Sequence, residues 1–230
     1  MSTKEVKRFF LAVVVVGGCA IVSNGFAADD MMMKDKETAG KMMEKPMAME
    51  KPMAMEKPMS PEEKAMMEKM QSFMTPGENH KVLDAVVGNW DFTINSWMSA
   101  DAKPEESTGT AEFAWTMDGH FVKETVKSSM MGRPFEGMGF VGYDNLKKEY
   151  VSIWLDNMST GVMKSSGQYD AASKTLTYNG TFSCPMVDGD RASREVTTLI
   201  DADHFTHEMH SPGADGKEFK MMEIKYTRKK

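Results

Sequence analysis

Three histidines recur at every third position near the C-terminal end: His204, His207 and His210. Imidazole is a common zinc ligand, and a helix would bring all three side chains to one side. However, apolar residues at 205 and 209 alternate with polar ones at 206 and 208, which favours a β-strand. On a strand, His207 faces away from the other two, so the three cannot form one metal site. His207 is instead a polar group on an apolar face, where an ordinary hydrogen-bonded histidine is the main alternative to a functional one.

Charged residues share strand faces with apolar ones at four further places, namely Glu124, Glu136, Asp156 beside Trp154, and Arg194. A buried charge must be paired or hydrogen-bonded. If these faces point inward, Arg194 can hold a carboxylate through two parallel hydrogen bonds. The predicted ligand then has an acidic head and an apolar body. The alternative is that these are exterior charges, because a register error of one residue inverts every face.

No catalytic constellation is complete. The chain has no Gly-x-Ser-x-Gly elbow and no glycine-rich phosphate loop between a strand and a helix. Cys184 is a lone cysteine before a proline, and such residues are more often packed than reactive. No catalytic residue is therefore assigned. An enzyme that uses Glu136, Asp156 or His207 as acid or base stays an alternative to a binding protein.

The element pattern changes at Gly88-Asn89-Trp90, after a short amphipathic helix over residues 80–87. From Trp90 onwards apolar and polar residues alternate, which is typical of half-buried strands. Turn clusters such as Asp118-Gly119 separate about ten such strands. A long meander removes its exposed edges by closing. The sequence thus predicts an all-β fold, an up-and-down antiparallel barrel of about ten strands with a short N-terminal helix.

A short helix, Gly88 and Trp90 at the start of the first strand, and Arg228 near the end of the last strand resemble the calycin pattern of lipocalins and fatty-acid-binding proteins. The resemblance implies that Arg228 stacks on Trp90 at the closed end of the barrel. In calycins that bind haem, one interior histidine ligates the iron, so His207 would be the ligand if haem binds here. The cofactor itself is unknown.

Residues 77–230 more closely resemble DUF1579, a bacterial domain family of unknown function. The resemblance lies in residues 130–137, 142–145, 154–161, 194–197 and 215–220. It implies a fold but no activity.

The N-terminus has the features of a secretory signal peptide over residues 1–27. Lys4, Lys7 and Arg8 precede an apolar stretch, and small residues lead to a cleavage position after Ala27. Export to the periplasm or the medium is predicted, with no transmembrane span in the mature protein. Lipidation at Cys19 is the minority alternative, because the stretch stays apolar beyond that cysteine.

Residues 28–59 form a low-complexity linker rich in Met, Lys, Glu and Pro, in which Glu-Lys-Pro-Met-Ala-Met repeats. Proline at every sixth position excludes a continuous helix, so a disordered tether is expected. Its thioethers suit Cu(I), and the candidate ligands are Met47, Met49, Met53 and Met55. The alternative is that the methionines are merely tolerated or act as an oxidation sink. A capping box at Ser60 predicts a short helix over residues 60–75, and the barrel domain fills residues 76–230.

The formal charge is −6, and the chain lacks the clustered Lys and Arg residues that a nucleic-acid-binding surface needs. The favoured function is non-catalytic binding of a small, partly apolar molecule in the barrel. The alternatives are a filled barrel that acts as a scaffold, an enzyme, and copper handling by the tether. The oligomeric state is not specified by the sequence.

Overall fold

The computed structural model describes residues 59–130, 132–213 and 215–230. The predicted signal peptide, Cys19 and the predicted tether up to residue 58 lie outside the described residues. No helix in the described part of the chain is long and apolar enough to cross a membrane.

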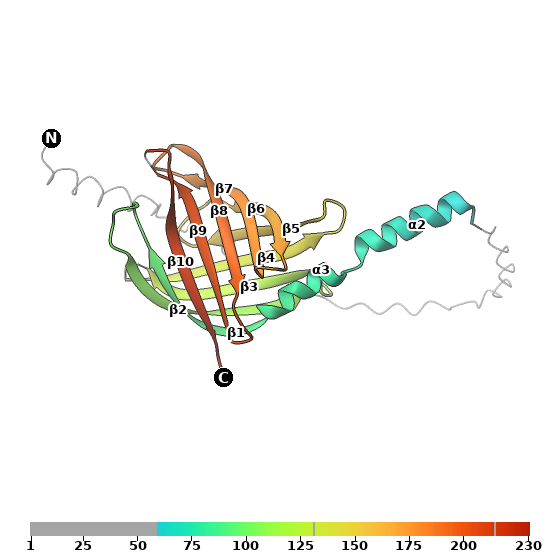
Figure 1. The fold of residues 1–230 in the computed structure, drawn as a ribbon, viewed down its shortest axis with the longest axis horizontal. Coiled ribbons are helices and arrows are strands. Elements are labelled where there is room, and N and C mark those ends of the chain that lie inside the picture. The colour runs from blue at the N-terminus through green and yellow to red at the C-terminus, as the bar shows by residue number, and fades with distance from the viewer. Residues whose placement is uncertain (1–58, 131, 214) are drawn as a thin grey trace, which may run out of the picture. The chain divides into compact units, whose positions relative to one another are not determined.

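Ten antiparallel strands close into one barrel, in which each strand pairs with its neighbours in sequence and β1 pairs with β10 (Figure 1). The all-β barrel predicted from the alternating pattern is confirmed. The strands are β1 (Gly88–Ser96), β2 (Glu105–Thr116), β3 (Phe121–Met130), β4 (Arg133–Asp144), β5 (Glu149–Asp156), β6 (Met163–Asp170), β7 (Thr175–Cys184), β8 (Gly189–Leu199), β9 (His204–Pro212) and β10 (Glu218–Arg228).

Three short helical segments precede the barrel: α2 (Pro61–Met74), α3 (Glu78–Lys81) and the 3₁₀ turn η2 (Val82–Ala85). The capping box starts α2, since Ser60 Oγ accepts a hydrogen bond from the Glu63 amide at 3.2 Å and Glu63 accepts one from the Ser60 amide at 2.7 Å. Leu83 of η2 is buried against the barrel core. The segment α3–η2 occupies the amphipathic stretch that the sequence placed before β1.

One end of the barrel is closed around Trp90, which is fully buried. Its indole N–H donates to the Val86 carbonyl at 2.8 Å, and the Arg228 guanidinium lies 4.1 Å from the ring centroid. Arg228 also donates to the carbonyls of Val87 and Ala85 at 2.7 and 3.0 Å. Gly88 has a φ of +135°, and a Cβ at this position would collide with the guanidinium. The structure therefore has the Gly88, Trp90 and Arg228 arrangement expected from the calycin resemblance.

Aromatic side chains fill the interior above Trp90. The Phe205 ring meets Trp90 edge to face at 4.7 Å and stacks on Tyr226 at 4.1 Å. Phe92 and Phe113 pack beside Tyr226. These rings come from strands at both ends of the sequence, so they hold the closing β1–β10 pair together.

Candidate functional site

A cavity of about 430 Å³ occupies the barrel above this aromatic cluster. Such a volume is within the usual range of small-molecule sites. Apolar side chains line most of it. At the end nearest Trp90 the cavity is lined by Leu83, Val86, Phe113 and Phe205. The other end is lined by residues at or next to the β3–β4, β5–β6 and β9–β10 connections, including Met130, Phe135, Met158, Val162 and Met221.

Glu124 projects from β3 into this apolar space, between Val122 and Val126 on the same face. Its carboxylate accepts a hydrogen bond from the Tyr226 hydroxyl at 3.3 Å, which is long for an O–H donor. Burial raises the pKa of Glu124 to about 7, because the surroundings disfavour the charged form. Glu124 therefore changes charge near neutral pH at the cavity wall.

Glu195 projects into the cavity from β8, and its side chain is buried. Ser193 Oγ donates to it at 3.4 Å, and burial raises its pKa above the ordinary value. Tyr178 of the paired strand β7 lines the same wall. Its pKa is raised by burial and, secondarily, by the nearby Glu195. This wall thus adds a second protonatable carboxyl group.

His207 lies on the inner face of β9 and lines the cavity. Its Nδ1 is 3.0 Å from Thr197 Oγ1, and burial lowers its pKa to about 4. The imidazole is therefore neutral at pH 7. His204 and His210 lie on the other face and contact Asp201 and Glu208 respectively. The histidines are divided as the strand prediction required, and the haem-ligand role of His207 stays a prediction.

Trp154 and Asp156 both line the cavity from β5. Asp156 accepts three hydrogen bonds, from the Trp154 indole at 2.9 Å and from the amides of Met158 and Ser159 at 2.9 and 3.0 Å. It therefore fixes the ring and the start of the β5–β6 connection. Two glycines of β4 make room for the ring, since a Cβ at Gly137 would collide with it.

Arg194 and Glu136 do not line the cavity, so the interior position expected for them is incorrect. Arg194 instead forms an ion pair with Glu218 at 2.6 Å. On β8 the inward residues are Ser193, Glu195 and Thr197, which places Arg194 outside. On β4 the buried alternation includes Gly137 and Gly139, so the exposed Glu136 lies on the outer face with Met138. Arg194 is therefore not positioned to bind the carboxylate of a ligand inside the barrel.

Sequence reasoning identified Glu124, Trp154, Asp156 and His207 on faces that prove to be interior, but it missed Glu195, Thr197, Tyr178 and Tyr226. For Glu195 the available signal was the alternation of Ser193, Glu195 and Thr197 with Arg194 and Val196. Small polar residues at 193 and 197 made that face look exterior. Tyr226 could have been found from its alternation with Ile224, which also lines the cavity.

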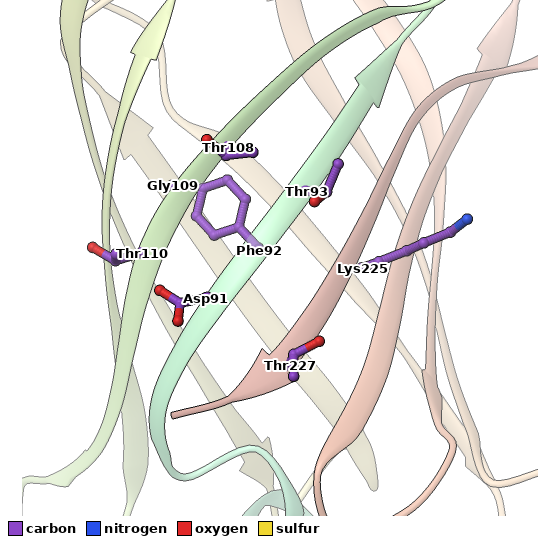
Figure 2. A pocket seen from close by; sticks show the side chains of 8 residues that line it. All are labelled: Asp91, Phe92, Thr93, Thr108, Gly109, Thr110, Lys225 and Thr227. Carbon is purple, nitrogen blue, oxygen red and sulfur yellow. The ribbon is translucent and has the colours of Figure 1, made fainter. Parts of the chain in front are cut away.

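A second, more open depression of about 400 Å³ lies across β1, β2 and β10 (Figure 2). Threonines, Asp91 and Lys225 border it. The Phe92 ring fills the space left by the missing side chain of Gly109. Apart from Phe92 and Gly109, the residues that line the depression are polar or charged. In the described residues, no group of three or more His, Cys, Asp or Glu side chains is arranged to hold a metal ion.

Similarity to a crystal structure supports the fold. The chain is similar to the crystal structure of Rv2717c from M. tuberculosis, with 12% identity, a TM-score of 0.52, and coverage of 68% of this chain and all of that one. A redesigned β-barrel matches at 14% identity with a TM-score of 0.36, covering 65% of this chain and 96% of that one. No curated protein matches the chain. The family model "Protein of unknown function (DUF1579)" matches residues 75–228, which are most of the chain, and the protein therefore belongs to the DUF1579 family.

Proposed function

We propose that this protein is exported and binds a small, partly apolar molecule non-covalently inside its barrel. The observation that carries the proposal is the interior cavity of about 430 Å³, which is largely apolar and has a few convergent polar groups. Export rests on the basic and apolar N-terminal sequence that ends at Ala27. A filled barrel that serves only as a scaffold is the competing reading.

Native mass spectrometry of the chain, purified without denaturation, tests the binding proposal. We expect a co-purifying organic molecule, or a mass shift on adding single-chain amphiphiles. A clean mass with no shift for any amphiphile would support the scaffold instead.

A cavity-filling variant tests where the molecule binds. Val126 points inward and lines the cavity, whereas Thr125, next to it on β3, points outward. We expect Val126→Trp to weaken amphiphile binding at least about tenfold, a loss of about 1.4 kcal/mol. Thr125→Trp should leave it within about threefold. Calorimetric titration measures both, and equal effects of the two variants would place binding outside the barrel.

A further inference from the structure

The charge of the cavity lining suggests which polar group a ligand carries. Its ionisable residues are Glu124, Asp156, Glu195, His207 and two tyrosines, and no Lys or Arg is among the described residues that line it. Since His207 is neutral at pH 7, no lining side chain supplies positive charge there. The lining therefore disfavours a ligand with an acidic head, which the sequence suggested. It favours a ligand whose polar group is a hydrogen-bond donor or a cation.

Glu124 is the carboxyl group best placed to meet such a head. Asp156 already accepts three hydrogen bonds. Glu195 has two serine hydroxyls beside it, those of Ser165 and Ser193. Glu124 has the single long contact with Tyr226. A carboxylate accepts about four hydrogen bonds. Glu124 thus retains acceptor capacity at the cavity wall.

An aromatic ring lies close to this carboxylate. A Cβ built at Gly139 would lie 3.4 Å from Glu124 Oε2 and 3.2 Å from Trp154 Cε3. The carboxylate and the indole therefore lie against the same glycine, and both line the cavity. An anionic oxygen beside an indole suits an ammonium group, which is attracted to both.

We propose that the barrel binds an apolar amine, whose ammonium group sits at Glu124 beside Trp154 and whose hydrocarbon body fills the rest of the cavity. This inference rests on the proposed function, because it requires that the cavity be open to a ligand. The ammonium donates to Glu124 and replaces the contacts with water that burial removed. The aliphatic and aromatic lining takes up the chain.

Three probes of equal chain length test the proposal by calorimetric titration into the full chain at pH 8: decylamine, decan-1-ol and decanoate. We expect decylamine to bind at least about tenfold more tightly than decan-1-ol, because charge-assisted hydrogen bonds exceed neutral ones. Decanoate should bind most weakly. Equal or tighter binding of decanoate would overturn the proposal.

Substitutions then locate the ammonium group. We expect Glu124→Gln to remove the preference for decylamine over decan-1-ol while decan-1-ol affinity stays within about threefold. Glu136→Gln, on the outer face, should leave the preference intact. Should Glu124→Gln fail to fold, Trp154→Leu serves as the second variant and should reduce the preference several-fold. A preference that survives in these variants would overturn the assignment.

The probes also separate this inference from the function on which it rests. Binding of decan-1-ol with no preference for decylamine would overturn the amine assignment alone. No binding of any of the three would overturn both proposals. At pH 6 the preference should shrink, since the pKa of Glu124 is about 7 and protonation removes its charge. The other titratable groups that face the cavity are Tyr226, Tyr178, Glu195, Asp156 and His207.

Discussion

Replacing Trp90 with alanine is expected to lower the free energy of unfolding by about 3–5 kcal/mol, the usual cost of truncating a large aromatic side chain in a core. Trp90 has no exposed surface. Its removal would leave a cavity between Phe205 and the Arg228 guanidinium. The Val86 carbonyl would also lose the hydrogen bond that it accepts from the indole N–H. Urea unfolding followed by far-UV circular dichroism measures the loss.

Trp97 provides the matched control. It follows β1 at the opposite end of the barrel, is only partly buried, and lies 5.6 Å from the Lys220 ammonium. Trp97→Ala should cost about 1 kcal/mol or less, in line with substitutions outside the core. Equal losses in the two variants would show that the closed end is not a special source of stability.

The contribution of Trp90 depends on Arg228, which covers the ring. Trp90 and Arg228 are directly opposite each other in the β1–β10 pair. The arginine also ties that pair to the chain before β1, through the Val87 and Ala85 carbonyls, and to the Ala202 carbonyl before β9. A lysine has no planar fork and cannot make these three contacts together. The closed end therefore joins the two termini of the barrel.

The alternating pattern predicted the strands and the closure of the barrel because every strand has one face in the core. The framework of Gly88, Trp90 and Arg228 was also readable, since a glycine of positive φ, a buried indole and a covering guanidinium are chemically distinctive. These features depend on local sequence and on the pairing of the first strand with the last.

The sequence left the interior faces of β4 and β8 undecided, and the alternative that placed Glu136 and Arg194 inside is wrong for two physical reasons. On β4 the inner face has Gly137 and Gly139, whose missing side chains make room for Trp154, so the apolar residues Met138 and Phe140 lie outside. On β8 the inner face is polar because it lines a cavity rather than a packed core. Hydrophobicity identifies the inner face where side chains are packed, but it does not identify a strand that gives polar residues to an otherwise apolar cavity, as β8 does.

The pairing of Glu124 with Tyr226 could not be read from the sequence either. The two residues are 102 positions apart, and β1 and β2 lie between their strands in the sheet. Their contact crosses the interior, so it depends on barrel diameter and on the aromatic cluster beneath. Sequence alternation shows which residues point inward, but not which of them meet.

Glu124→Gln is expected to stabilise the protein at pH 8 by about 3 kcal/mol, and to change its stability little near pH 4.5. The pKa of Glu124 is about 7 in the folded protein and close to the ordinary 4.5 in the unfolded chain. Between these values the folded state holds a proton that the unfolded state has released. Stability therefore falls as pH rises through this window, by about 1.4 kcal/mol for each unit of pKa difference. Glutamine removes the charge and with it this loss.

His207 acts in the opposite direction to Glu124. Its pKa is about 4 when folded and about 6.5 when unfolded, so stability is lost as pH falls through that window. In the wild-type protein the two trends offset each other between about pH 4.5 and 6.5, while Glu195, whose pKa is also raised by burial, adds to the trend of Glu124. His207 and Glu195 are present in both proteins, so their contributions cancel when the stability of the wild type is subtracted from that of Glu124→Gln. Urea unfolding from pH 4.5 to 8 should show this difference growing from little at pH 4.5 to about 3 kcal/mol at pH 8. Glu136→Gln on the outer face should follow the wild type. Parallel profiles for Glu124→Gln and the wild type would mean that Glu124 is already hydrated in the barrel, which would remove the desolvation on which its raised pKa depends.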